Sequence, residues 1–193
     1  MDFRFSEEQD LLRDMLARYL SDHYTFDARQ AAVNSAIGWR PDCWRAFAQD
    51  LGLLGIGIPE RFGGSGGGIV DYLAVMEQFG RHLVLEPYLG TAILAVEALQ
   101  HADETLAADV LPAIAAGERV VGWAHAEPEL RYGIAPRVRA EADAGGYRLH
   151  GRKALVSGAP WATHFIVSAN TAEGPTLFWV ERTAPGLTLI ESP

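Results

Sequence analysis

The sequence lacks the features on which several classes of protein depend. Its 193 residues include a single cysteine, Cys43, which excludes an intrachain disulfide framework and a cysteine-rich zinc site. Basic residues are few, with 16 Lys and Arg against 25 Asp and Glu and a formal net charge of −9, whereas nucleic-acid binding needs a dense basic surface. No apolar run approaches the roughly 18 residues of a membrane span, and no signal peptide opens the chain. We therefore expect a soluble cytoplasmic protein that binds neither nucleic acid nor membrane.

The first two-thirds of the chain has the hydrophobic periodicity of helices. Ser6-Glu7-Glu8-Gln9 fits a capping box, in which the Ser6 hydroxyl accepts a free backbone N–H and Gln9 reaches back. The apolar residues that follow would form one stripe along a helix: Leu11, Leu12, Met15, Leu16, Tyr19 and Leu20. Similar patterns predict further helices over 42–51, 70–79, 91–101 and 104–117.

Beyond Gly117 the pattern changes to short runs rich in aromatic and β-branched residues. Turn residues such as Gly145-Gly146 and Pro185-Gly186 separate them. The runs cover 120–125, 147–150, 154–157, 165–169, 176–180 and 187–190. Helices followed by strands predict an α+β fold, with an all-helical N-terminal domain over 1–118 and an antiparallel β domain over 119–193.

A glycine loop, Gly63 to Gly68, separates two of the predicted helices. Such loops can bring backbone N–H groups against a phosphate. The phosphate-loop pattern ends in Lys and then Ser or Thr, however, whereas Ile69-Val70-Asp71 follows here. A plain inter-helix loop, which could still line a pocket, is the favoured interpretation.

The side chains that could bind a metal or act as nucleophiles form no complete motif. The six histidines include no pair four residues apart, and Ser157 does not stand in a nucleophile elbow. His125 and Glu127 would share one face of a strand, a weak pattern for a metal site, and we expect no metal. Basic residues such as Arg137 and Arg152 form either a solvated face or a site for an anionic ligand.

Several segments in a fixed order resemble the acyl-CoA dehydrogenase family. They are 5–12 (FSEEQDLL), 51–66 (LGLLGIGIPERFGGSG), 76–81 (MEQFGR), 111–118 (LPAIAAGE), 126–128 (AEP) and 146–159 (GYRLHGRKALVSGA). Their order and spacing cover nearly the whole chain. The run Glu-Pro-x-x-Arg-Tyr from Glu127, with Glu86-Pro87-Tyr88-Leu89 upstream, looks most like the small subunits of heteromeric dehydrogenases that act on pimeloyl-CoA or steroid side-chain thioesters.

The resemblance implies a helical N-terminal domain, a middle β domain and a C-terminal four-helix domain, with FAD between the last two. It also implies a reaction of lipid metabolism, the α,β-dehydrogenation of an acyl-CoA thioester. In this reaction a carboxylate removes the α proton while flavin N5 takes the β hydride. Pro193 falls inside the family's middle domain. We therefore expect the catalytic base to lie outside this chain and assign no catalytic residue within it.

The same resemblance implies which residues face the flavin. They are Trp123, His125, Ala126, Leu155, Val156 and Ser157. Ala126 stands where the family usually has a flavin-binding Thr, so only backbone contacts are expected there, and Leu155 replaces the usual shielding Trp, while Ser157 keeps a hydroxyl near N5. The run 129–132 (ELRY) replaces the usual Ala-Gly-Ser-Asp near the pyrophosphate.

Three functions fit these observations. The first is a flavin oxidoreductase, incomplete alone, that works in a homo- or hetero-oligomer with another dehydrogenase subunit and passes electrons to an electron-transfer flavoprotein or similar acceptor. The alternative is a non-catalytic scaffold subunit of a heteromeric acyl-CoA dehydrogenase, which would share one FAD with its partner. The third is a related oxidase or flavin monooxygenase, distinguished by the oxygen reactivity of its reduced flavin. In the first case the helices before Gly80 and the glycine loop would line the site of the acyl tail.

Overall fold

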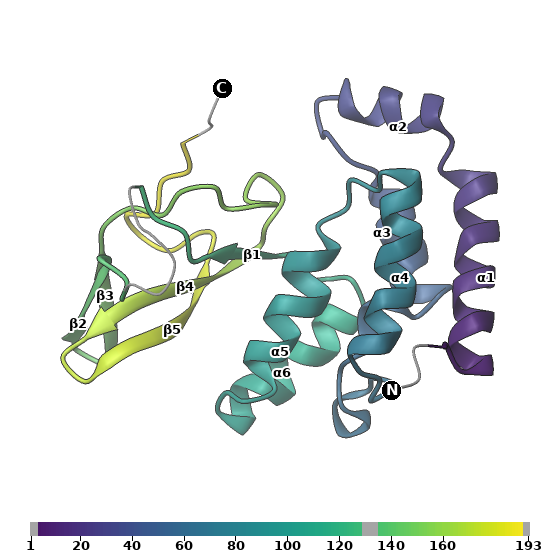
Figure 1. Cartoon of the computed structure of the whole chain (residues 1–193). Coiled ribbons are helices and arrows are strands. Elements are labelled where there is room, and N and C mark those ends of the chain that lie inside the picture. The colour runs from purple at the N-terminus through teal and green to yellow at the C-terminus, as the bar shows by residue number, and fades with distance from the viewer. Residues whose placement is uncertain (1–3, 129–134, 191–193) are drawn as a thin grey trace. The chain divides into compact units, whose positions relative to one another are not determined.

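The computed structural model describes residues 4–128 and 135–190 of the chain. Two compact units divide it, Met1–Glu118 and Arg119–Pro193. The described part of the first unit contains helices and that of the second contains strands (Figure 1). This order confirms the α+β class, and each unit is described below by itself.

Helices of several kinds build the first unit. Its elements are α1 (Glu7–His23), α2 (Phe26–Val33), α3 (Pro41–Gln49), η1 (Leu53–Gly55), η2 (Glu60–Phe62), α4 (Ile69–His82), the π-helix η3 (Leu89–Ala95), α5 (Val96–Leu99) and α6 (Glu104–Ala115). The periodicity did not predict α2, which is short and buries only Ala32. A helix expected at 91–101 is instead a π-helix continued by α5, and Tyr72 donates a hydrogen bond of 2.8 Å to the Ala92 carbonyl within it.

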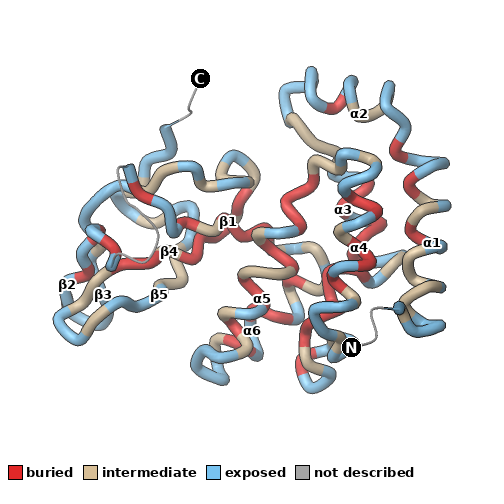
Figure 2. The backbone as a smooth tube through the Cα atoms, viewed as in Figure 1, coloured by how far each residue is buried: buried red, intermediate tan, exposed pale blue. Residues whose placement is uncertain are grey.

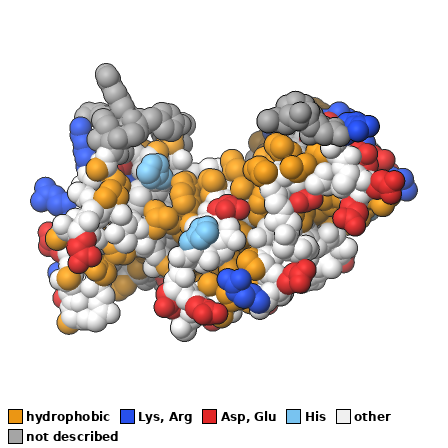
Figure 3. Space-filling model, turned by 60° about the horizontal axis from the view of Figure 1, so that its bottom comes forward, with side chains coloured by type: hydrophobic (Ala, Val, Ile, Leu, Met, Phe, Trp, Pro, Cys, Tyr) orange, Lys and Arg blue, Asp and Glu red, His pale blue; other side chains and the backbone are white. Residues whose placement is uncertain are grey.

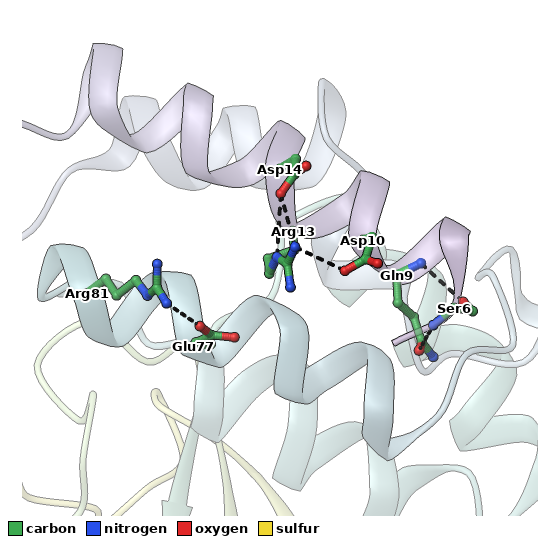
Figure 4. A network of polar contacts seen from close by, with 7 residues as sticks. All are labelled: Ser6, Gln9, Asp10, Arg13, Asp14, Glu77 and Arg81. Carbon is green, nitrogen blue, oxygen red and sulfur yellow. Dashed lines mark hydrogen bonds and ion pairs between the residues drawn. The ribbon is translucent and has the colours of Figure 1, made fainter. Parts of the chain in front are cut away.

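The capping box at the start of α1 is present, as the sequence predicts. The Ser6 hydroxyl accepts from the Gln9 N–H at 3.2 Å, and Gln9 Oε1 accepts from the Ser6 N–H at 3.0 Å (Figure 4). One turn later, Arg13 lies 3.0 Å from Asp10 and 3.4 Å from Asp14. These surface pairs contribute little to stability, so the cap is the stronger local signal for where α1 begins.

Most of these helices contain buried residues (Figure 2). The largest fully buried side chains of this unit are Tyr24, Tyr88, Phe47, Leu16, Leu20, Leu53, Leu54, Ile58, Leu111, Ile114, Gln78 and Val75. Other apolar side chains stay at the surface, as Figure 3 shows for one face of the molecule, and Leu11 and Leu73 are 71% and 55% exposed.

The second unit contains a mixed five-stranded sheet. β4 (His164–Thr171) is its central strand, with β5 (Gly174–Glu181) antiparallel on one side and β1 (Val121–Ala124) parallel to it. β2 (Arg139–Asp143) and β3 (Gly146–His150) form a hairpin, and β2 touches β4 in parallel at Arg139 and Asn170.

The sheet differs in two respects from the expected antiparallel one. The hairpins β2–β3 and β4–β5 are antiparallel, whereas β1 and β4 run parallel because a long connection that contains the β2–β3 hairpin joins them. The runs 154–157 and 187–190, expected as strands, are irregular segments. Leu155 explains the first, since its φ of +52° lies in the left-handed region and is incompatible with a strand.

Candidate functional site

Two segments far apart in the sequence meet at the C-terminal end of β1. The Ala154 N–H donates to the Ala126 carbonyl at 2.9 Å, and Lys153 Nζ donates to the His125 carbonyl at 3.2 Å. The residues that follow β1 and the segment 153–157 are therefore neighbours. These are the two segments that the sequence analysis expects at the flavin.

An ion pair between Lys153 and Glu127 anchors this junction. The two charged atoms lie 2.6 Å apart, and the side chains are only 8% and 3% exposed. Glu127 also accepts from the Arg137 N–H at 2.8 Å and the Val138 N–H at 3.1 Å. Burial acts to raise the pKa of Glu127, but the bonds from Lys153 and these N–H groups outweigh it, so the pKa is lowered.

This geometry replaces the metal-ligand interpretation of Glu127. Both of its carboxylate oxygens already accept hydrogen bonds, and the nearest cation is Lys153. Residues 4–128 and 135–190 contain no group of three or more His, Cys, Asp and Glu side chains that could hold a metal ion.

Lys153 also connects this ion pair to the sheet. Its Nζ donates to the Ser168 hydroxyl at 2.9 Å, and Ser168 Oγ lies 3.0 Å from His125 Nδ1. Ser168 is buried in the central strand β4. A continuous polar network thus runs from Glu127 through Lys153 and Ser168 to the imidazole of His125.

Trp123 and His125 border a hollow on one face of the sheet. Alternate residues of a strand face the same side, and the register opposes Trp123 to Ile166 of β4. The hollow has a volume of about 560 Å³. Its lining is Trp123, His125, Ala135, Pro136, Ser168, Pro175, Thr176 and Leu177. Apolar walls with a few polar groups are typical of small-molecule sites.

Segment 155–157 presents its side chains differently. Leu155 is 90% exposed, and Ser157 is exposed beside it. Val156 packs over Gly122, where an added Cβ would lie 3.3 Å from Val156 Cγ1 and 2.7 Å from the Phe165 ring. Because Gly122 and Trp123 are consecutive in the strand, Val156 lies on the face opposite the hollow. The structure therefore brings the six predicted residues to one end of β1 but distributes their side chains over two faces.

A second hollow lies beside the ion pair. It has a volume of about 290 Å³ and is lined by Glu127, Pro128, Arg137, Val138, Gly151 and Arg152. Because Arg137 and Arg152 are among these residues, an anionic ligand in this unit stays a prediction. The expected contact of residues 129–132 with a pyrophosphate falls on positions outside the described residues.

Backbone N–H groups of the glycine loop in the helical unit donate hydrogen bonds to backbone carbonyls of the same unit. The N–H groups of Ser65, Gly66 and Gly67 donate to the carbonyls of Gly55, Ile58 and Ile56 at 2.7–3.0 Å. These donors are therefore not directed at a phosphate. The loop is a structural connection, as the sequence pattern favours.

Sequence reasoning missed Lys153 and Ser168 as members of this network. Each acts through partners that are distant in sequence, 26 residues for Lys153 and Glu127 and 43 for Ser168 and His125. Lys153 lies within the segment 146–159 that resembles the family, but no local pattern in the sequence indicates its partners, and Ser168 belongs to no quoted segment.

Among the helices that the structure describes, none combines the length and apolar character needed to cross a membrane. This finding agrees with the absence of long apolar runs in the sequence.

Comparison with known proteins places these features in a family. A profile described as "Acyl-CoA dehydrogenase, N-terminal domain" matches residues 6–118, and one described as "Acyl-CoA dehydrogenase, middle domain" matches residues 115–193. The mitochondrial isovaleryl-CoA dehydrogenase of Pongo abelii is 30% identical over 192 residues, which cover 94% of this chain and 45% of that protein.

Solved structures show the same relationship. The ChsE4–ChsE5 complex from Mycobacterium tuberculosis superimposes with a TM-score of 0.87 at 28% identity and covers 97% of this chain and 50% of the matched one. A variant of the Tcur3481–Tcur3483 steroid ACAD gives a TM-score of 0.85 at 33% identity, with 94% and 50% covered. The chain thus spans about half the length of these relatives.

Proposed function

Because the chain belongs to the acyl-CoA dehydrogenase family, a family of flavin oxidoreductases, we propose that it binds FAD and takes part in the α,β-dehydrogenation of an acyl-CoA thioester. The catalytic base would be supplied from outside these 193 residues. The proposed substrate class includes acyl-CoA thioesters with bulky tails, since one of the matched structures is described as a steroid ACAD.

The observation that carries the proposal is the exposed end of β1 beside Leu155. The Leu155 side chain is 90% exposed, and the backbone φ of this residue is +52°, a region that costs energy for a residue other than glycine. A cofactor that covered the side chain would remove apolar surface from water. Next to Leu155 lie the Ser157 hydroxyl and, through the Ala154–Ala126 hydrogen bond, the segment that ends β1. A planar aromatic ring with polar edges fits both the apolar and the polar parts of this surface.

The residues of this chain would bind and orient the cofactor. FAD, when bound, supplies the hydride acceptor. Trp123 and His125 would contact its ring from the end of β1, and Ala126 would contribute backbone contacts alone. Leu155 would shield the ring from water, Val156 would hold that segment against Gly122, and Ser157 would donate its hydroxyl.

The visible absorption spectrum of the purified 193-residue chain tests the proposal. We expect a flavin band, either in the chain alone or after co-expression with a larger dehydrogenase subunit, and bleaching of that band by an acyl-CoA in the assembled protein. A chain that carries no FAD in either preparation would overturn the proposal.

A second candidate function is that of a scaffold subunit with little flavin of its own. The absence of a hydroxyl at Ala126 favours it, and so does the similarity to a chain of the ChsE4–ChsE5 complex. Such a subunit would form a hetero-oligomer in which the partner performs the chemistry and passes electrons to an acceptor such as an electron-transfer flavoprotein. One FAD for each pair of chains, with site variants of this chain leaving it bound, would favour the scaffold.

A further inference from the structure

The polar network beneath the hollow determines which ring nitrogen of His125 carries the proton. We infer that His125 is held as the Nε2–H tautomer and that its side chain donates a hydrogen bond from Nε2 to a carbonyl oxygen or ring nitrogen of the flavin. This inference rests on the proposed function. It adds a side-chain contact at a position where the family resemblance predicts a flavin-facing residue without assigning it a bond.

The ammonium group of Lys153 has three donors and no acceptor. Its Nζ donates to Glu127 Oε1 at 2.6 Å, to Ser168 Oγ at 2.9 Å and to the His125 carbonyl at 3.2 Å. All three donors are therefore used. In the contact with Lys153, Ser168 Oγ is therefore the acceptor.

The hydroxyl proton of Ser168 needs an acceptor other than Lys153. The side chain is buried, with 4% of the residue exposed, so water does not readily accept this proton. Within residues 4–128 and 135–190, Ser168 Oγ has two partners, Lys153 Nζ and His125 Nδ1. Since the lysine can only donate, the proton of Ser168 goes to His125 Nδ1 at 3.0 Å.

The tautomer of His125 follows from the chemistry of imidazole. A neutral ring whose Nδ1 accepts must carry its proton on Nε2. In the described part of the chain Nε2 has no hydrogen-bond partner, and His125 is exposed where it borders the hollow. Nε2–H is thus a donor available to a ligand, and its orientation is set by Ser168 and Lys153 acting as positioning residues.

The ligand that suits this donor is a planar ring with acceptor atoms at its edge. Trp123, Pro136 and Leu177 line the hollow around His125 and provide apolar contact. The pyrimidine part of a flavin carries two carbonyl oxygens and one unprotonated ring nitrogen that accept hydrogen bonds. Donation to one of them would favour the reduced ring, on which negative charge accumulates.

Nitrogen NMR of the histidine-labelled 193-residue chain tests the tautomer without any ligand. We expect His125 Nδ1 to resonate as an unprotonated acceptor nitrogen and Nε2 as a protonated one. Ser168→Ala should convert His125 to a mixture of tautomers, whereas Ser168→Thr, which retains the hydroxyl, should preserve the pattern. A protonated Nδ1 in the unmodified chain, or an Ala variant identical to it, would overturn the inference.

FAD titration of two matched variants tests the donor. His125→Gln places an amide N–H near the position of Nε2, whereas His125→Asn retains an acceptor for Ser168 but has no group at that position. We expect Asn to weaken FAD binding about five- to tenfold and Gln about twofold or less. Equal affinities for both variants and the unmodified chain would overturn the contact with flavin.

The two proposals fail in different ways. If the unmodified chain binds no FAD, alone or with a partner subunit, the proposed function is overturned and the flavin contact with it, while the NMR result still decides the tautomer. If the unmodified chain binds FAD and the Asn variant binds equally well, only the inference about His125 is overturned.

Discussion

Among the residues that the structure describes, each unit buries one glutamate, and the two environments contrast. In the helical unit, Glu86 accepts hydrogen bonds from the Tyr24 hydroxyl at 2.8 Å and the Arg40 backbone N–H at 3.1 Å, and burial raises its pKa. In the β unit, the pKa of Glu127 is lowered despite burial, because Lys153 and two backbone N–H groups bind its charged form. The difference lies in whether a cation contacts the carboxylate.

The contrast has a structural meaning. Around Glu86 the hydrogen-bond donors are mostly neutral. Their bonds connect the end of α1, the start of α3 and the segment before η3, so this glutamate has a structural role. Around Glu127 the network continues through Lys153 and Ser168 to an exposed imidazole. A polar network in which every member is hydrogen-bonded holds its side chains in one arrangement, and this one ends at an exposed imidazole, so we place the candidate site there.

The largest effect is expected on breaking the buried ion pair. Lys153→Met would leave the charge of Glu127 buried with only two N–H partners, and we expect the free energy of unfolding to fall by about 3–5 kcal/mol. Urea unfolding followed by tryptophan fluorescence measures it, with Arg152→Met as the exposed neighbouring control. A loss no greater than that of the control would contradict the role of the pair.

The next comparison between the units concerns glycines at which neighbouring atoms leave no room for a Cβ. A Cβ at Gly64 would lie 2.0 Å from the Ile58 carbonyl, which is backbone, whereas at Gly122 it would meet the Phe165 ring at 2.7 Å. We expect Gly64→Ala to destabilise by about 2–4 kcal/mol and Gly122→Ala by about 1–2 kcal/mol, since a side chain can move aside. Thermal and urea unfolding of both variants measure these costs, and the reverse order would contradict the interpretation.

The pH dependence of unfolding should have opposite signs for the two glutamates. Glu86 has a raised pKa, so its contribution to stability is present below its ordinary value of 4.5 and is lost as the pH rises through the raised pKa. Glu127 has a lowered pKa, so its contribution is present above 4.5 and is lost as the pH falls through the lowered pKa. Glu86→Gln should flatten the stability curve above pH 4.5, and Glu127→Gln should flatten it below. Urea midpoints between pH 3 and 8 measure both, and a common sign would contradict the assignment.

Local signals explain what the sequence alone could predict of the fold. The cap of α1 and the turn at Gly145 depend on neighbouring residues, and the structure contains both. β2 was missed because Arg139, Glu141 and Asp143 alternate with alanines, a composition with low strand propensity, and its place depends on pairing with β3.

In the candidate site, too, some features could be predicted from the sequence, whereas others depend on tertiary contacts. Family resemblance predicted its two segments, and the structure brings them together through Ala154 and Ala126. The network that orients His125 could not be predicted, because it depends on tertiary contacts of Lys153 and Ser168 with residues 26 and 43 positions away. Local periodicity also favoured a strand over 154–157, where the left-handed backbone of Leu155 is set by its surroundings.

The smallest effect, and the one that separates the units most sharply, concerns two leucines in the left-handed conformation. Leu83 at the end of α4 has a φ of +53° and Leu155 has a φ of +52°, and both are exposed. Substitution of either by Gly relieves a strain of about 1 kcal/mol, partly offset by the flexibility of glycine in the unfolded chain, so both variants should be slightly more stable. Only Leu155→Gly should also weaken FAD binding, by about tenfold, because it removes apolar contact with the ring. Unfolding curves and FAD titrations of the two variants measure this. If both bind FAD as the unmodified chain does, the exposed leucine of the β unit is no flavin contact and is equivalent to the one in the helical unit.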